Sequence, residues 1–147
     1  MDYEAIKTGL PAAIPFVQLL KLEYVDVGPG TATVRLPDRP QLSNHVGSQH
    51  AGALFTAAEA ASGGAFVSAF SEHMPEITAL AKSARISYER LARGPIDATG
   101  TLEDAGALLA TLDSDGRVEF PIEVVMRDQD GQQVASATVD WHVRRKS

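Results

Sequence analysis

The stretch AGALFTAAEAASGGAFVSAFS, residues 51–71, decides the fold of this chain. Nearly all of its residues are small or apolar, and Glu59 is its single ionisable side chain. A run of this length with so little charge is predicted to be a helix buried in the core. Its many alanines and glycines favour close approach by other backbone, as in a sheet wrapped around the helix.

Glu59 shares one face of the predicted helix with aromatic side chains. On an α-helix, a shared face holds Phe55, Glu59, Ser62, Phe66 and Phe70, at spacings of four, three, four and four residues. A carboxylate on such a dry stripe loses hydration, which raises its pKa and makes it a useful general base near neutral pH. A structural role, in which backbone amides or an arginine satisfy the carboxylate, remains the alternative.

The stretch is also long enough to span a membrane, because about 20 residues suffice. Three features argue against a span: Ala, Gly and Ser outnumber Leu and Ile, Glu59 is costly in lipid, and the flanks carry no positive cluster. We therefore expect a core helix and no membrane partner.

The whole chain has the composition of an ordinary globular protein. Its 147 residues are 44% apolar and 22% charged, which predicts a single domain over residues 1–147. The net charge of −6 argues against nucleic acid as a partner. The absence of cysteine excludes disulfides, thiolate catalysis and cysteine-based metal sites. No basic segment precedes an apolar one near the N-terminus, so we expect a cytoplasmic location.

Before the predicted core helix, the pattern indicates one short helix and a hairpin. The short helix is expected over residues 3–10, ended by Pro11 and Pro15. From Leu20 the apolar residues alternate with polar ones, and the Gly-Pro-Gly of residues 28–30 turns the chain into a second strand.

After the core helix, alternation predicts strands over residues 77–91, 96–104, 118–126 and 135–143. Residues 104–116 are ambiguous between a short helical turn and a loop that ends in an Asp-Ser-Asp-Gly turn. About six strands and one long helix predict an α+β fold, in which a mostly antiparallel sheet curls around the central helix.

The loop and helix of residues 44–65, NHVGSQHAGALFTAAEAASGGA, carry a recognisable motif. Asn44 is followed three residues later by Gly47, then by His50-Ala51-Gly52 and by the acidic Glu59. This order resembles the hotdog-fold thioesterases. The nearest group is the phenylacetate-pathway type of acyl-CoA thioesterase, with its relatives of unassigned function that carry Glu where Asp is more usual.

A second stretch, ISYERLARGPIDATG at residues 86–100, resembles the strand-turn-strand that follows the helix in this family. The order of elements is similar over residues 15–144, which implies a hotdog fold. Two positions depart from the family pattern, because His-Gly-Gly has become His50-Ala51-Gly52 and Glu59 replaces Asp. Ala keeps its backbone N–H and Glu keeps a carboxylate, so neither change removes the chemistry.

The resemblance implies an acyl-CoA thioesterase-like hydrolase. Glu59 would activate water as a general base or attack the thioester carbonyl itself. The N–H groups of Ala51 and Gly52 would stabilise the oxyanion, because amides at a helix N-terminus are unpaired. Asn44 and His50 would position the substrate, with loop formation and turn capping as their alternative roles.

Seven further residues are candidates for substrate binding. They comprise a loop glycine of the motif, two phenyl rings and a hydroxyl on the Glu59 stripe, a hydroxyl at the start of the next strand, and two arginines suited to coenzyme A phosphates. The alternative role for the two hydroxyls is packing. The alternative for the two arginines is that they belong to an ordinary solvated surface. These residues are Gly47, Phe55, Ser62, Phe66, Thr78, Arg90 and Arg93.

The resemblance also implies a homodimer, with sheets joined edge to edge and two sites at the interface, or a tetramer built from such dimers. A helix that is apolar nearly all round is consistent with this assembly. The expected partners are an acyl-CoA or other acyl thioester and a second copy of the chain. The alternatives are a non-catalytic hotdog module that binds acyl-CoA or an acyl ligand, and a structural dimer without a ligand.

Other chemistries lack their motifs. The sequence contains no G-x-S-x-G, H-E-x-x-H, Walker A or G-x-G-x-x-G pattern, and its four scattered histidines give no zinc spacing. The paired Asp and His motif of hotdog dehydratases is absent as well. We therefore expect neither a metal nor a cofactor.

Overall fold

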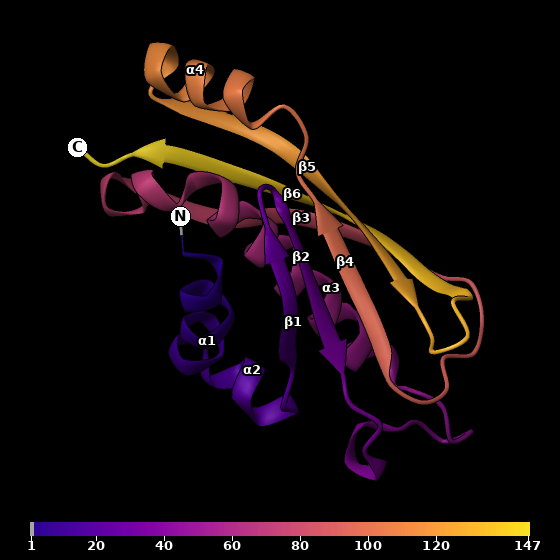
Figure 1. Cartoon of the computed structure of the whole chain (residues 1–147). Helices are drawn as coiled ribbons and strands as arrows, with labels where there is room; N and C mark the ends of the chain where they lie inside the picture. Colours follow the sequence, from indigo (N-terminus) through magenta and orange to yellow (C-terminus); the bar gives the residue numbers. More distant parts are fainter. Residues whose placement is uncertain (1) are drawn as a thin grey trace.

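A computed structural model describes residues 2–147, in which six strands form one sheet around a long helix (Figure 1). The strand order is β1-β2-β4-β5-β6-β3, and every neighbouring pair is antiparallel. The α+β class and the sheet curled around a central helix are confirmed, and this arrangement is a hotdog fold. The strands are β1 (Glu23–Gly28), β2 (Thr31–Leu36), β3 (Ile77–Tyr88), β4 (Ile96–Thr101), β5 (Arg117–Arg127) and β6 (Gln133–Arg145).

The central helix α3 (Ala51–Phe70) lies against the inner face of the sheet, and small residues bring the two backbones close together. A Cβ atom added at Gly100 of β4 would lie 2.8 Å from the carbonyl oxygen of Ala61. One added at Gly64 would lie 2.7 Å from the Cβ of Ala32 on β2. Both distances are shorter than any ordinary contact, so the Ala and Gly content of the helix follows from its packing against the sheet.

Burial inside the protein distinguishes this core helix from a membrane-spanning helix. The segment Ala51–Glu76 is long and apolar enough to cross a bilayer by length and composition, but 67% of its apolar window is buried inside the protein. The second half of α3 packs its aromatic rings against the sheet, where Phe66 stacks on Trp141 of β6 at a centroid distance of 5.1 Å.

Two helices precede the sheet and correct the prediction for the N-terminus. Helix α1 (Tyr3–Ala13) runs through Pro11 for a further part-turn, where the prediction ended it at residue 10. It stops at Ile14, whose backbone is extended because the following Pro15 disfavours the helical conformation there.

Helix α2 (Pro15–Leu20) replaces the start of the strand that was predicted from Leu20. Pro15 occupies its first turn, a position that suits the fixed φ of proline. Lys21 ends it with φ of 55°, and β1 starts only at Glu23. Figure 1 shows both helices in indigo beside β1, and α1 also contacts α3.

The ambiguous segment after β4 is a full helix, α4 (Ala105–Asp115). It packs on β5 through side chains that include the fully buried Leu112. The Asp-Ser-Asp-Gly sequence therefore forms the last turn of this helix and its cap, where Gly116 has φ of 76°. Short 3-10 helices, η1 (Pro40–Leu42) and η2 (Ser71–Glu76), lie on either side of α3 in the sequence.

Candidate active site

Glu59 lies in the middle of α3, half-buried, on the wall of an apolar pocket of about 230 Å³. Burial raises the pKa of its carboxyl above the ordinary value of 4.5. Within residues 2–147, neither an ion pair nor a hydrogen bond engages this carboxylate. A structural carboxylate held by an arginine or by backbone amides would show such partners, so the geometry favours a chemical role.

The pocket is formed by α3, the two N-terminal helices and the inner face of the sheet. Helix α3 supplies one carboxylate and otherwise small or apolar side chains, and the N-terminal helices supply aliphatic ones. Its lining residues are Leu10, Ile14 and Val17; Glu59, Ala60, Gly63, Phe66 and Val67; and Tyr24, Met74, Ala79 and Trp141. An apolar lining lowers the local dielectric constant, so it strengthens any electrostatic interaction made within the pocket.

Tyr24 of β1 brings a second polar group to the pocket. Its side chain is buried, and its hydroxyl donates to the carbonyl oxygen of Ala60 at 3.2 Å. Burial raises the pKa of this phenol, and the nearby Glu59 carboxylate raises it further. Tyr24 therefore remains neutral at physiological pH, and its charge does not compete with that of Glu59.

The residues predicted to share a stripe with Glu59 separate into three environments. Phe66 lines the pocket, as expected for a substrate-binding residue. Ser62 is fully buried; its hydroxyl donates to the carbonyl oxygen of Glu59 at 2.7 Å and accepts from Trp141 Nε1 at 3.1 Å. Phe55 is 39% exposed and lies outside the pocket lining. The Ser62 hydroxyl thus donates to one protein group and accepts from another, which is consistent with the alternative packing role.

The N-terminus of α3 is capped by His50. Its Nδ1 accepts from the N–H of Gly52 at 2.8 Å, so one of the two predicted oxyanion donors is already engaged. The N–H of Ala51 has no acceptor within the helix, as is usual for a first helical residue. Ala51 precedes Glu59 by eight residues, or about 12 Å along the helix axis. One chain therefore does not bring the Ala51 amide to the Glu59 carboxylate.

Asn44 organises the loop before α3. Its Oδ1 accepts from the N–H groups of Val46 and Ser48 at 3.1 and 3.0 Å, and its Nδ2 donates to Ser48 Oγ at 2.8 Å. Gly47 has φ of 75°, a conformation that favours glycine, and its N–H donates to the Asn44 carbonyl oxygen. In the isolated chain, the alternative loop-forming role of Asn44 accounts for its contacts.

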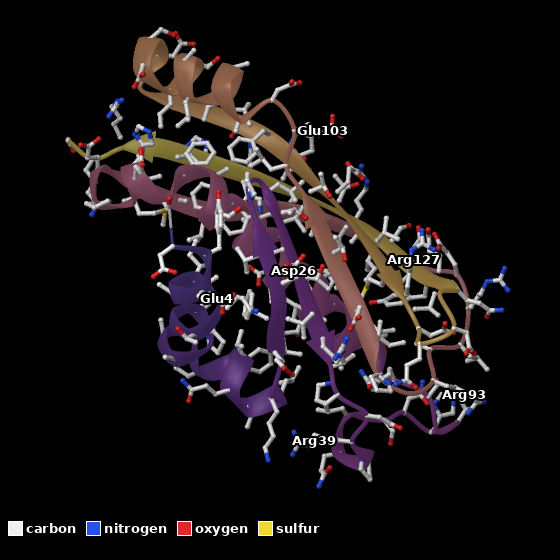
Figure 2. All side chains as sticks on the ribbon, viewed as in Figure 1. Glu4, Asp26, Arg39, Arg93, Glu103 and Arg127 are labelled. Atoms are coloured by element: carbon white, nitrogen blue, oxygen red, sulfur yellow. The ribbon has the colours of Figure 1, made fainter. Side chains whose placement is uncertain are left out.

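Gln49 ties this loop to the segment between β3 and β4. Its buried side chain donates to the carbonyl oxygens of Pro37 and Gly94, each at 3.0 Å. Its backbone N–H donates to the carbonyl oxygen of Ala92 at 2.8 Å. Arg93 is consequently held on an exposed turn next to the loop that leads into α3 (Figure 2). Sequence reasoning did not single out Gln49, because a glutamine in a loop gives no pattern.

Two other predicted residues lie apart from the pocket. Thr78 is exposed, on the face of β3 opposite to Ala79, which lines the pocket. Arg90 is exposed and lines a polar surface depression with Glu89 and two glutamines.

The sequence analysis missed the contribution of the N-terminal helices and of Tyr24, Gly63, Met74 and Trp141. The apolar spacing of Leu10, Ile14 and Val17 was a usable signal, since these positions recur every three to four residues as on one helix face. Trp141 gave no such signal, because β6 is far from α3 in sequence and only the assembled sheet brings its ring against Phe66 and Ser62.

Comparison with known proteins identifies a family without an assigned function. The model of the family described as Domain of unknown function (DUF4442) matches residues 3–143. No protein in the curated collection matches the chain.

Solved structures share the fold over almost the whole chain. The Pseudomonas aeruginosa protein PA5026, described as of unknown function and a probable thioesterase, is 28% identical, with a TM-score of 0.89, covering 99% of this chain and 97% of that one. The conserved protein PA5202 of the same organism is 25% identical, with a TM-score of 0.72, covering 88% and 94%. PaaI, from the phenylacetic acid degradation operon of Escherichia coli, shares the fold at 18% identity and a TM-score of 0.72, covering 99% and 94%.

Proposed function

The chain belongs to the DUF4442 family of hotdog-fold proteins, and from that premise we propose that it hydrolyses acyl thioesters, with Glu59 as the general base. The observation that carries the proposal is the Glu59 carboxylate on the wall of an apolar pocket, with its pKa raised by burial and with no ion pair or hydrogen bond from residues 2–147. A carboxylate so placed is a stronger base than an exposed one. The similarity to PA5026, a probable thioesterase, supports the same reaction class.

In the proposed reaction, the Glu59 carboxylate accepts a proton from water, and the water oxygen bonds to the carbonyl carbon of the thioester. Negative charge moves to the carbonyl oxygen, where a backbone N–H stabilises it. When the carbonyl re-forms, the carbon–sulfur bond breaks and the thiolate takes the proton held by Glu59. The products are a carboxylic acid and a thiol, and no other reactant is needed.

The oxyanion donor is proposed to come from a second copy of the chain. The Ala51 N–H lies about 12 Å from Glu59 along the helix, too far to serve the same carbonyl. The Ala51 amide of a neighbouring chain is not bound by this distance along one helix. The Gly52 amide can donate to the same oxyanion only if its hydrogen bond to His50 breaks. Asn44, Gly47 and His50 then hold this loop in position.

The carrier is proposed to be coenzyme A. Arg93, on the exposed turn that Gln49 ties to the α3 loop, and Arg90 near it in sequence, are the proposed contacts for its phosphates. Arginine suits this task because its planar guanidinium donates two hydrogen bonds to one phosphate. A cytoplasmic location fits such a substrate.

Turnover of a panel of acyl-CoA thioesters by wild type and Glu59→Gln tests the proposal. Thiol release can be followed with a thiol reagent without background from the protein, because the chain has no cysteine. We expect Glu59→Gln to lower turnover by at least about a hundredfold, since general-base catalysis contributes about that much or more. Glu72→Gln, an exposed change just after α3, is the matched control and should retain wild-type turnover.

Full turnover in Glu59→Gln would contradict the role of Glu59. A wild-type protein that binds acyl-CoA but hydrolyses no thioester would instead be the non-catalytic acyl-binding module. Neither turnover nor binding would leave a structural dimer.

A further inference from the structure

The pocket beside Glu59 extends well beyond the carboxylate. Along α3, Glu59 is the first residue of its wall and Val67 the last, a span of about 12 Å along the helix axis. Met74, which follows α3 in sequence, also belongs to the wall. The carboxylate therefore stands at one end of the α3 wall, and the rest of that wall is apolar.

The N-terminal helices supply a second part of the wall. Leu10 and Ile14 face the pocket from α1 and the residue that follows it, and Val17 faces it from α2. A group held at Glu59 is therefore enclosed between α3 and this N-terminal segment. Apart from Glu59 at its end, such a lining selects an apolar group and offers no partner for a charged or sugar-like one.

The size of the pocket limits what it can hold. Its volume of about 230 Å³ is below the roughly 300–1,000 Å³ of sites for drug-sized ligands. A dry apolar cavity of about 150 Å³ holds benzene, so scaling by volume gives room for about nine non-hydrogen atoms. That suits a linear acyl group near octanoyl, or one carrying a single phenyl ring, and excludes a long fatty chain.

Gly63 controls the width of the pocket at its middle. It lies one turn after Glu59 on the same wall, and a Cβ atom there would meet the Trp141 ring at 3.8 Å, an ordinary contact. A larger side chain at this position can therefore enter the pocket without displacing backbone. The pocket volume at this level is available because residue 63 has no side chain.

We propose that this pocket binds the acyl group of the substrate, limited to about nine non-hydrogen atoms, with Gly63 and Ile14 setting that limit. The predicted effects on turnover rest on the proposed function. The predicted binding of an acyl group does not depend on it. The thioester carbonyl lies at Glu59, and the acyl tail runs along α3 toward Val67 and Met74.

Two variants with opposite effects test the assignment by activity. In wild type, kcat/KM across linear acyl-CoAs from acetyl to palmitoyl should peak near octanoyl or shorter and fall sharply beyond it. Gly63→Val should move the peak at least two carbons shorter and lower kcat/KM for octanoyl-CoA at least tenfold, with little change for acetyl-CoA. Ile14→Ala should move the peak toward longer chains. Gly9→Val, on a part of α1 with open space around it, is the matched control.

Trp141 gives a second readout that needs no turnover. It is the sole tryptophan of the chain, and it lines the pocket. Octanoate and benzoate should change its fluorescence in a saturable way in wild type and Gly9→Val, and octanoate should do so weakly in Gly63→Val. A response to only one of the two ligands would show whether the pocket takes the linear or the aromatic acyl group.

The two proposals fail separately. An active wild type that prefers palmitoyl-CoA, or whose chain-length profile is unchanged in Gly63→Val, would overturn the acyl pocket and leave hydrolysis standing. An inactive wild type whose Trp141 still responds to octanoate, and less so in Gly63→Val, would support the pocket and overturn hydrolysis.

Discussion

At the scale of single residues, Glu59 is in an environment that opposes its charge. Its side chain is half-buried in an apolar pocket, and no cation pairs with it in the part of the chain that the structure describes. A carboxylate placed in this way lowers the stability of the folded protein when it ionises. Such a local loss of stability is common where a group is kept for its chemistry.

This gives a pH-dependent difference in stability between wild type and Glu59→Gln. Because burial raises the folded pKa above 4.5, the folded state holds the proton more tightly than the unfolded state. The stabilising contribution of the protonated carboxyl is complete below pH 4.5 and is lost as pH rises through the folded pKa. Urea unfolding from pH 4 to 8 should show wild type losing stability relative to the variant, by up to about 1.4 kcal/mol per pH unit in that window. If the free energy of unfolding changed with pH in the same way in both proteins, the predicted raised pKa of Glu59 would be contradicted.

The sequence predicted Glu59 and Phe66 correctly as neighbours on one helix face, because helical periodicity is a local property. It could not predict that the Gly52 amide is taken by His50, since this depends on the rotamer of one side chain. Tyr24 and Trp141 reach the pocket from β1 and β6, far from α3 in sequence, so no local pattern marks them.

At the scale of elements, the contact between α3 and the sheet depends on residues without side chains. Gly100 of β4 lets the backbone of the sheet approach that of α3, and no flexible group lies at the contact. Displacing either element would also move the wall that carries Glu59.

Gly100→Ala should therefore destabilise the protein by about 1–3 kcal/mol, as overpacking of a rigid core does. Its added Cβ would lie 2.8 Å from the Ala61 carbonyl oxygen, and backbone on both sides must shift. Gly106→Ala on α4 is the matched control: it has open space around it and should be neutral or stabilising by up to about 1 kcal/mol. Equal midpoints in urea for Gly100→Ala and wild type would show that the contact is looser than described.

Elements with strong periodicity were predictable, and the short connecting helices were not. Helix α2 has six residues, too few for a helical period to emerge against the alternation that follows it. Helix α4 was ambiguous because its Asp-Ser-Asp-Gly end is also a common turn sequence. Burial of Leu112 against the sheet favours the helix over a loop.

At the scale of the whole molecule, one end of the sheet is the edge strand β3, whose outer side has no strand beside it within residues 2–147. β3 is twelve residues long and stands at the edge next to β6, with most of its side chains exposed, including Leu80 at 58%. A long, exposed edge strand presents a row of unpaired N–H and C=O groups that can pair with a strand of another chain. Tyr88 links this edge to α3, because its hydroxyl donates to the carbonyl oxygen of Ala51 at 3.1 Å.

We expect the protein to form a homodimer through this edge, and Leu80→Lys to weaken it. An introduced charge on each copy would repel across the joined strands, whereas an exposed leucine can be replaced without loss of the fold. Light scattering should give twice the chain mass for wild type, a lower mass for Leu80→Lys and an unchanged mass for the control Leu19→Lys on α2, which is 68% exposed. Thioester turnover should fall with the dimer, and a monomeric but fully active wild type would contradict the shared site.

The position of β6 in the sheet limits how early the sheet can be completed as the chain is synthesised. β6 follows β3 and β5 along the chain and pairs with both, and more than forty residues separate the end of β3 at Tyr88 from the start of β6 at Gln133. Until β6 emerges from the ribosome, β3 lacks its neighbouring strand and the aromatic half of α3 lacks Trp141. The aromatic half of α3 therefore lacks this part of its cover until β6 is made, which makes this step a natural point of engagement for a chaperone.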